Sequence, residues 1–304
     1  QKPNYTKEAY YIKTPITRVA SMSSIYTTMI AQLKCEDKIV AIDNVDYYNN
    51  TFIQEQVKKG FIIELSKGPQ IDIEKTIALQ PDLFLTFGMG SPKDDVDKKL
   101  VQSSMPIAVS IDHLEETPLA RAEWIKFFAY FFNKESLADS LFQITEKKYK
   151  DLKTLAQSST HKPSVLTEIK YGDAWYIPAG KSFIAHLIED AGGDYFWKED
   201  SKTGSSAQSF ETVYAKAKDC DIWINLYNLN SKKELLSYDE RYDLFKACKN
   251  NQLYNNNKTQ NTLGYSNYWE TGITNPDEVL ADLIAIFSPT LLQNHEFSFY
   301  KKLE

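Results

Sequence analysis

Two glutamates, Glu74 and Glu211, carry the clearest chemical signal in this sequence because they occupy matching positions. Each opens a short stretch of helical periodicity, which is followed by an aspartate and then by an apolar run typical of a strand. An acidic residue in the first turn of a helix is stabilised by the helix dipole, so capping alone would explain both. Equivalent exposed carboxylates could instead dock arginine or lysine side chains of a partner. The spacing leaves both roles open.

Aromatic residues form a second candidate feature because several stand in polar, turn-like segments behind predicted strands. The segment 171–175 (YGDAW) is one of these, and Met89 lies in a glycine-containing turn after another strand. Rings at such places suit a pocket for a large, partly apolar ligand, although aromatic residues most often belong to a core. We expect ligand contacts from Met89 and from Tyr171 or Trp175. A further aromatic cluster, for which either role is open, comprises Tyr265, Tyr268 and Trp269.

No group of residues has the spacing of an enzyme active site or a metal site. The motifs G-x-S-x-G and H-E-x-x-H are absent, the four histidines are scattered, and the turn at 88–91 completes no nucleotide fingerprint. Cys35, Cys220 and Cys248 are too few for a disulfide framework or for the cluster of a nitrogenase-like enzyme, and pairing of Cys220 with Cys248 is left open. We expect no catalytic residue, no metal site, no cofactor and no enzymatic activity.

Strands and helices alternate in the first half of the chain. Serines at 21, 23 and 24 can cap a helix that runs to Leu33, and Pro81 ends a short helix over Ile73–Leu79. An amphipathic helix is expected over Thr117–Phe132. The expected strands span Arg18–Ala20, Lys38–Ile42, Phe61–Leu65, Asp82–Phe87 and Ile107–Ile111.

A long helical pattern follows at 134–157, with Asn133 as its cap, and would run about 36 Å. The plan of the first half then repeats. A strand is expected at Ser164–Ile169 and a helix at Ser182–Ala191, which Gly192 and Gly193 close. A short helix begins at Glu211, and a strand follows at Ile222–Ile224.

The pattern predicts an α/β fold of two Rossmann-like lobes joined by a single long helix. The expected divisions are a tether at 1–13, an N-terminal lobe at 14–133, the linker helix at 134–157 and a C-terminal lobe at 158–304. Ligands of open α/β sheets bind beyond the carboxyl ends of the strands. The expected ligand site is therefore a cleft between the lobes.

The charge balance and the hydropathy pattern exclude further classes of function. The 304 residues include 35 basic and 41 acidic side chains, a net charge of −6, and the arginines are confined to Arg18, Arg121 and Arg241. Nucleic-acid binders present a basic field, so we expect no nucleic-acid partner. No apolar run approaches the roughly 18 residues of a membrane helix. The chain starts at Gln1 rather than Met, and we expect a targeting segment to have been removed.

The chain resembles the class III substrate-binding proteins of ABC importers, which carry iron–siderophore complexes, haem and cobalamin. The resemblance covers roughly residues 15–292. It rests on the segments 18–21, 71–83 (IDIEKTIALQPDL), 210–213, 221–224 and 275–283, with Ser288-Pro289 after them. It implies the fold of two lobes and a long helix already expected from the pattern.

The resemblance also implies roles for individual residues. In the family, one glutamate on each lobe meets basic residues of the permease, and Glu74 and Glu211 match those positions. Tyr47 and Tyr48 lie where cobalamin binders often have a tyrosine, Phe87 lies where an aromatic ring commonly lines the site, and a polar group such as Ser23 would orient the ligand. Cobalamin binders tend to have a tryptophan ahead of each docking glutamate, and here those loops have no aromatic residue.

The function implied is capture of a large metal chelate, an iron–siderophore complex or haem, or cobalamin, and its delivery to an ABC permease in the inner membrane. Catecholate siderophores need several cations, for which Lys170 and Lys181 are candidates, so a weakly charged hydroxamate or a haem ligated by tyrosine is left open. We expect a monomeric periplasmic lipoprotein of a Gram-negative cell, anchored through the removed segment. The alternatives are a manganese- or zinc-binding protein of similar architecture, or a receptor or adhesin that does not serve transport.

Overall fold

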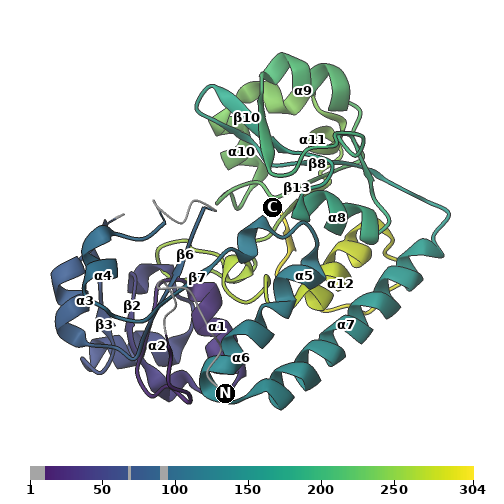
Figure 1. Cartoon of the computed structure of the whole chain (residues 1–304). Coiled ribbons are helices and arrows are strands. Elements are labelled where there is room, and N and C mark those ends of the chain that lie inside the picture. The colour runs from purple at the N-terminus through teal and green to yellow at the C-terminus, as the bar shows by residue number, and fades with distance from the viewer. Residues whose placement is uncertain (1–10, 68–69, 90–94) are drawn as a thin grey trace. The chain divides into compact units, whose positions relative to one another are not determined.

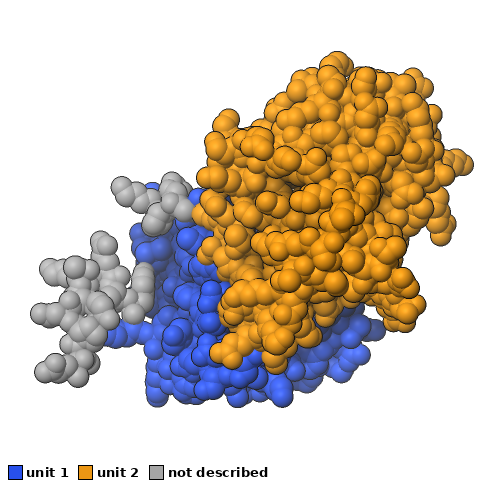
Figure 2. Space-filling view, turned by 90° about the vertical axis from the view of Figure 1, so that its right-hand side faces the viewer, with its two compact units in different colours: residues 1–113, 123–141 blue, residues 114–122, 142–304 orange. Residues whose placement is uncertain are grey.

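The computed structural model describes residues 11–67, 70–89 and 95–304, which separate into two units (Figure 2). Unit 1 comprises residues 1–113 and 123–141, and unit 2 comprises residues 114–122 and 142–304. Most of the tether expected at 1–13, together with Gly90 and Ser91 of the turn at 88–91, lies outside the described residues.

Unit 1 is built on a parallel five-stranded sheet with the strand order β3-β2-β1-β6-β7 (Figure 1). Its central strand is wholly buried, as strands covered by helices on both faces must be. The register pairs Val19 with Leu83 on one side and Ala20 with Ala41 on the other. The strands are β1 (Val19–Ser21), β2 (Ile39–Ile42), β3 (Ile63–Glu64), β6 (Leu83–Phe87) and β7 (Ile107–Ser110).

Polar side chains begin the helices of unit 1. Ser23, Asn50, Asp72 and Asp97 each accept a hydrogen bond from a backbone N–H in the first turn of the helix that follows. A small hairpin of β4 (Ser66–Lys67) and β5 (Gln70–Ile71) precedes the third of these helices. The helices are α1 (Ser24–Gln32), α2 (Thr51–Lys58), α3 (Ile73–Leu79), α4 (Lys98–Gln102) and α6 (Ile125–Phe132), with 3₁₀ turns at Glu36–Lys38, Val45–Tyr47 and Asp112–Leu114.

Unit 2 repeats this plan. Its sheet has the strand order β11-β8-β13-β14-β15, in which all neighbours are parallel except the last pair. A second, antiparallel sheet of order β12-β10-β9 leads into helix α9. The strands are β8 (Ser164–Thr167), β9 (Lys170–Tyr171), β10 (Ala174–Pro178), β11 (Asp194–Tyr195), β12 (Ser205–Gln208), β13 (Ile222–Ile224), β14 (Leu253–Asn255) and β15 (Lys301–Lys302).

The helices of unit 2 surround its five-stranded sheet. Among them, α8 and α12 lie side by side (Figure 1). Ser182 and Ser209 cap α8 and α9 as Ser23 caps α1 in unit 1. The helices are α5 (Pro118–Glu123), α8 (Phe183–Asp190), α9 (Phe210–Ala217), α10 (Lys232–Tyr238), α11 (Lys246–Lys249) and α12 (Pro276–Phe287), with 3₁₀ turns at Glu240–Leu244 and Asn267–Trp269.

The long helix expected from the sequence is α7 (Glu135–Gln157). Its residues up to Leu141 belong to unit 1 and those from Phe142 belong to unit 2. In unit 2 it is tied to neighbouring elements by the Tyr149 hydroxyl, which donates to Asp190 at 2.8 Å, and by an ion pair of Lys153 with the same carboxylate at 2.6 Å. The two-lobe α/β fold with its long helix is confirmed. Among the described helices, none combines the length and apolar character needed to cross a bilayer.

Two details of the expected elements are wrong. The helix expected over Thr117–Phe132 is two helices, α5 and α6, with a break at Trp124. Asn133 does not cap α7; it ends α6 in the left-handed conformation, with φ of 54°. Asparagine tolerates that conformation better than most side chains, which explains why it can close one helix just before the next.

Aromatic rings fill the core of unit 2. Trp175 and Trp223 stack with their centroids 5.5 Å apart and their planes at 23°, and Tyr242 meets both rings edge-on. Phe245 packs on the same pair at 5.9 and 5.0 Å. All three cysteines are buried and free, so Cys220 and Cys248 do not pair.

Candidate functional site

The carboxyl ends of the strands in unit 1 carry a buried hydroxyl network. The hydroxyl of Tyr48, which is wholly buried, donates to Asp43 Oδ1 at 2.8 Å and lies 3.3 Å from Thr27 Oγ1. Thr27 in turn donates to Ser21 Oγ at 3.0 Å. Burial raises the pKa of Asp43 to about 6, against the opposing hydrogen bond from Tyr48. This network holds the loop after β2 to the end of β1.

The predicted ligand residues of unit 1 divide by exposure. Tyr48 and Ser23 are committed to the structure itself, Tyr48 in the network above and Ser23 as the cap of α1, where its hydroxyl accepts from the Ile25 N–H at 3.3 Å. Tyr47 lies half-buried in a 3₁₀ turn. Phe87 and Met89, by contrast, expose 51% and 69% of their surface at the carboxyl end of β6. These two side chains are available to a ligand.

The turn after β6 needs a glycine for a steric reason. Gly88 is not among the glycines with a positive φ, so backbone conformation does not explain it. A Cβ on Gly88 would instead come within 2.5 Å of Asp95 Oδ2 and of Val109 Cγ1. The Asp95 carboxylate accepts the Met89 N–H at 2.6 Å, which fixes the backbone that presents Met89.

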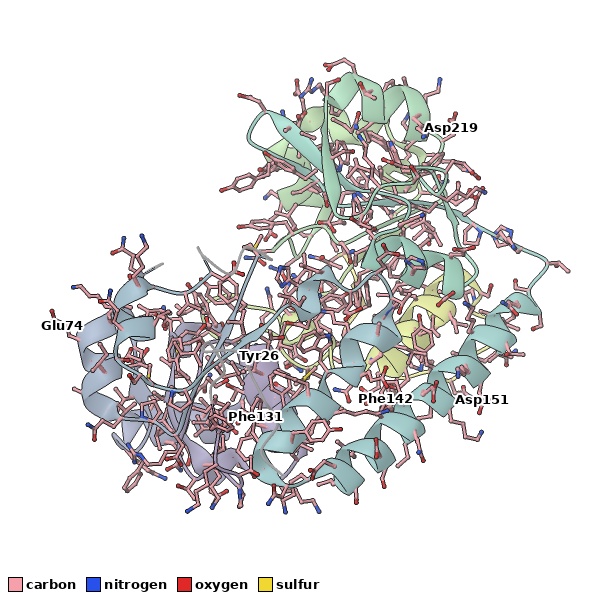
Figure 3. All side chains as sticks on the ribbon, viewed as in Figure 1. Tyr26, Glu74, Phe131, Phe142, Asp151 and Asp219 are labelled. Carbon is pink, nitrogen blue, oxygen red and sulfur yellow. The ribbon has the colours of Figure 1, made fainter. Side chains whose placement is uncertain are left out.

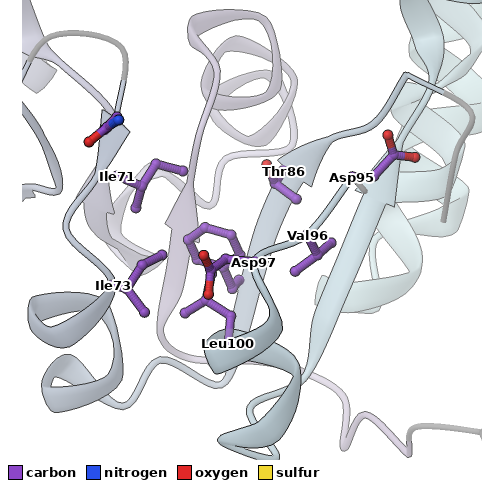
Figure 4. Close-up of a pocket in the computed structure, with 9 residues that line it drawn as sticks. Ile71, Ile73, Thr86, Asp95, Val96, Asp97 and Leu100 are labelled. Carbon is purple, nitrogen blue, oxygen red and sulfur yellow. The ribbon is translucent and has the colours of Figure 1, made fainter. Parts of the chain in front are cut away.

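A cavity of about 430 Å³ opens beside β6 in unit 1 (Figure 4). Its wall is shared with the hydrophobic core, and its two carboxylates already accept backbone N–H groups, Asp95 from Met89 and Asp97 from Lys99. None of the predicted ligand residues lines it. The lining residues are Gln70, Ile71, Ile73, Phe84, Thr86, Asp95, Val96, Asp97 and Leu100.

The carboxyl ends of the strands in unit 2 carry a second polar network, centred on Asn225. Its amide donates to Thr167 Oγ1 at 3.1 Å and lies 3.4 Å from Glu168 Oε1, and its carbonyl accepts the Tyr300 hydroxyl at 2.8 Å. Burial raises the pKa of Glu168 to about 7, despite hydrogen bonds from Asn225 and Thr167. Glu168 and Asn225 both adopt the left-handed conformation, with φ of 63° and 59°.

The two predicted ligand residues of unit 2 lie in different surroundings. Tyr171 exposes 69% of its surface. Trp175 is wholly buried in the aromatic core, where its Nε1–H also donates to the Thr167 carbonyl at 3.3 Å. A side chain without exposed surface cannot touch a ligand unless the core opens. The position of Trp175 therefore supports the core role that the sequence had left as its alternative.

Several exposed rings of unit 2 were not among the predicted site residues, and three of them follow strands of its parallel sheet. Tyr227 is 58% exposed just beyond β13, and Tyr265 and Trp269 are 43% and 50% exposed in the segment after β14. Tyr268, their neighbour in sequence, is buried against Tyr300 and Phe299. In the sequence, Tyr227 could have been recognised as a candidate because it lies two residues after Asn225, which directly follows the strand predicted at Ile222–Ile224.

Lysine and arginine are scarce at these strand ends. The described loops that follow β1, β2, β6, β7 and β13 contain none before the next element. Lys170 follows β8, and its ammonium lies 3.6 Å from Asp239 Oδ2. Lys258 follows β14, and its ammonium donates to the Phe297 carbonyl. The ammonium groups of Lys170 and Lys258 are therefore already engaged, and among the described residues no three His, Cys, Asp or Glu side chains gather as a metal ion would require.

The two glutamates of the repeat occupy the same position in their helices. Glu74 is the second residue of α3 and Glu211 the second residue of α9, and the caps ahead of them, Asp72 and Ser209, accept backbone hydrogen bonds in the same way. Glu74 is exposed and points away from the body of unit 1 (Figure 3). The carboxylate of Glu211 is 75% exposed, and hydrogen bonds from its own backbone N–H and from Ser209 lower its pKa.

Arg241 supports the second of these carboxylates. Its guanidinium lies 3.6 Å from Glu211 Oε1 and binds both oxygens of Asp239, at 2.9 and 2.7 Å. The same group sits 4.0 Å above the centre of the Phe210 ring. A guanidinium held on three sides gives Glu211 a defined cationic neighbour while leaving its carboxylate open to solvent.

Comparison with known proteins decides the family. The sequence profile described as "Periplasmic binding protein" matches residues 19–258, more than three quarters of the chain. The chain belongs to the periplasmic binding protein family. It is a binding protein rather than an enzyme, and its fold is the class III solute-binding fold.

Relatives of this binding protein include two proteins of Methanocaldococcus jannaschii that are named uncharacterized lipoproteins. One is 26% identical over 314 residues and covers 99% of this chain and 73% of the relative. The other is 22% identical over 317 residues and covers 96% of this chain and 75% of the relative.

Solved structures share the fold at lower identity. A periplasmic heme-binding protein from Roseiflexus sp. RS-1 aligns with a TM-score of 0.70 at 18% identity, over 91% of this chain and 99% of that chain. An ABC-type Fe³⁺-hydroxamate transport protein from Saccharomonospora viridis gives 0.67 at 17%, over 90% and 94%. The vitamin B12-binding protein of Vibrio cholerae gives 0.63 at 17%, over 92% and 99%.

Proposed function

We propose that this protein is the substrate-binding component of an ABC importer and that it captures a large metal chelate of low charge, of the ferric hydroxamate class. The observation that carries the proposal is found in each unit taken by itself: exposed apolar side chains stand at the carboxyl ends of the strands, and the described residues of the loops after β1, β2, β6, β7 and β13 include no lysine or arginine. The exposed side chains are Phe87 and Met89 in unit 1, and Tyr171 and Tyr227 in unit 2.

The chemistry of these surfaces favours one class of chelate over the others. Apolar contact with exposed rings stabilises a bound chelate in proportion to the area removed from water, at roughly 25 cal/mol per Å². A ferric triscatecholate carries several negative charges and needs cations to replace its hydration. Lys170 and Lys258 are already engaged, and the carboxyl groups at these strand ends, Asp43, Asp112 and Glu168, are held in internal hydrogen-bond networks. A neutral or cationic chelate avoids this electrostatic cost.

A titration tests the ligand class. Purified protein would be titrated, by quenching of tryptophan fluorescence, with a ferric trihydroxamate, cobalamin, haemin and a ferric triscatecholate in parallel. We expect the trihydroxamate to bind at least about 100-fold more tightly than the triscatecholate. Preference for the triscatecholate or for haemin would contradict the proposed class, and binding of none of the four would contradict the proposed function.

Glu74 and Glu211 are the residues that we propose dock the protein to its permease. Support comes from their equal positions in the two helices, their exposure, and the resemblance to proteins that dock through one glutamate on each lobe. An importer's binding protein works outside the cytoplasmic membrane, and relatives named lipoproteins support attachment there through a lipid anchor. Transport by cells expressing the docking variants tests this role, as described below.

A further inference from the structure

Tyr227 stands out from the other exposed rings because its backbone is strained. Its φ is 54°, in the left-handed region that bulky side chains rarely occupy, and the ring is 58% exposed. Holding such a residue there costs conformational free energy, and glycine would avoid the cost. Because the ring is exposed, its packing within the fold offsets little of this conformational cost.

Buried side chains fix the strained loop from both sides. Asn255, wholly buried on the neighbouring strand β14, donates from Nδ2 to the Tyr227 carbonyl at 2.7 Å and to the Leu229 carbonyl at 2.8 Å. Its Oδ1 accepts the Leu226 N–H at 2.8 Å. Asn225 anchors the other end of the loop through the Tyr300 hydroxyl at 2.8 Å. The ring of Tyr227 is therefore presented from a rigid base.

The loop of Tyr227 lies beside a segment that bears another ring. A Cβ on Gly264 would lie 3.9 Å from the amide nitrogen of Asn228, which places the segment carrying Tyr265 beside the Tyr227 loop. The loop itself, residues 225–231 (NLYNLNS), contains no charged side chain. Strain of this kind, held by satisfied buried partners, is concentrated at functional sites.

We infer that Tyr227 is a specificity-determining residue that contacts the ligand through the face of its ring. Asn255 acts as a positioning residue, because its hydrogen bonds fix the backbone from which the ring projects before the ligand arrives. The fixed backbone then contributes pre-organisation, since the loop does not have to be ordered on binding. This inference rests on the proposed function and adds to it a preference for chelates with an uncharged face that can lie flat on a phenol ring.

Three variants test the inference. Tyr227→Gly removes the ring and relaxes the backbone, and Tyr227→Phe keeps the ring without its hydroxyl. Lys34→Gly is the matched control for strain, because Lys34 is also exposed and left-handed (φ 59°) but lies in unit 1 directly after α1. Each would be titrated with a ferric trihydroxamate, cobalamin and haemin, and its urea unfolding midpoint measured without ligand.

We expect both glycine variants to unfold at a higher urea concentration than the unmodified protein. Tyr227→Gly should weaken binding of the preferred chelate at least tenfold, whereas Tyr227→Phe and Lys34→Gly should stay within about threefold. A Tyr227→Gly variant that binds within twofold of the unmodified protein would overturn the inference alone. An unmodified protein that binds no chelate would overturn the proposed function, so the two failures are distinguishable.

Discussion

Asp82 and Asp221 clamp the first strand of their respective units in the same way. Each stands one residue ahead of the sheet's next strand, β6 or β13. Asp82 Oδ2 accepts both the N–H and the hydroxyl of Thr17, at 2.8 Å each, and Asp221 Oδ2 accepts both from Ser164, at 2.9 and 2.7 Å. Each aspartate also donates its own N–H back to the start of that strand. The repeat therefore extends to individual carboxylates.

The clamp of unit 2 predicts a pH-dependent contribution to stability. Burial opposes ionisation of Asp221, but hydrogen bonds from Lys246 and Ser164 outweigh it and lower the pKa to about 2. A lowered pKa means stability that is present above the unfolded value near 4 and is lost as the pH falls towards 2. Asp221→Asn should lower the free energy of unfolding by about 1–2 kcal/mol at pH 7.

Urea denaturation at pH 7 and at pH 2.5 would measure this effect. The deficit of Asp221→Asn should shrink at the lower pH, where the carboxylate is partly protonated in the unmodified protein as well. Asp219→Asn is the control, since Asp219 is exposed two residues away (Figure 3). Equal stability of Asp221→Asn and the unmodified protein at pH 7 would contradict the clamp.

For Asp43, we predict a contribution to stability that depends on pH in the opposite direction to that of Asp221. Burial raises its pKa to about 6, so ionisation above that pH is unfavourable in the folded state, and this residue's contribution falls as the pH rises from about 4 to 6. Asp43→Asn keeps an acceptor for the Tyr48 hydroxyl without the buried charge. We expect it to be more stable than the unmodified protein at pH 7.5, by about 1–3 kcal/mol, with the difference vanishing near pH 4.

Thermal unfolding across this pH range would test the prediction, with Asp46→Asn as the control because Asp46 is exposed on the same loop. A loss of stability in Asp43→Asn at pH 7.5 would show that the charge itself supports the loop. A gain in stability of Asp43→Asn at pH 4 but not at pH 7.5 would contradict the predicted direction of the pH dependence.

Trp175 and Tyr171 should respond differently to truncation. Trp175→Ala removes a ring packed between Trp223 and Tyr242 and should cost about 3–5 kcal/mol of unfolding free energy. Tyr171→Ala removes an exposed ring and should change stability by less than about 0.5 kcal/mol. In chelate titrations, we expect Tyr171→Ala to weaken binding several-fold. Stability and affinity that changed together in Tyr171→Ala would argue for a structural role.

The docking glutamates should matter for transport and not for capture. Glu74→Lys combined with Glu211→Lys should abolish uptake of the chelate by cells while leaving the affinity of the purified protein unchanged. The matched control is Glu135→Lys with Glu278→Lys, since both residues are also exposed in the first turn of a helix. Loss of affinity in the docking variant would place these residues at the ligand instead.

Local signals explain what the sequence could predict. The bounds of α3 follow from Asp72 as its cap and from Pro81 just beyond its end, both within a few residues of the helix. The matching positions of Glu74 and Glu211 follow from the same local repeat. These features need no knowledge of distant contacts, and the structure confirms the bounds of the helix and the matching positions.

Distant partners explain what the sequence could not predict. The sequence around Trp175 predicts a polar turn, whereas the residue lies in strand β10, and its burial depends on Trp223 and Tyr242, roughly 50 to 70 residues further along the chain. The conformation of Tyr227 depends likewise on Asn255 in another strand. Neither partnership leaves a mark in the local pattern, so the sequence predicts neither the burial of Trp175 nor the conformation of Tyr227.

The stacked indoles of Trp175 and Trp223 also have an optical consequence. Two chromophores 5.5 Å apart absorb ultraviolet light as a coupled pair, and their circular dichroism contains paired bands of opposite sign. Those bands vanish once the rings separate, at the moment when the interior of unit 2 comes apart. The unfolding of unit 2 can therefore be followed through this signal, without an attached dye.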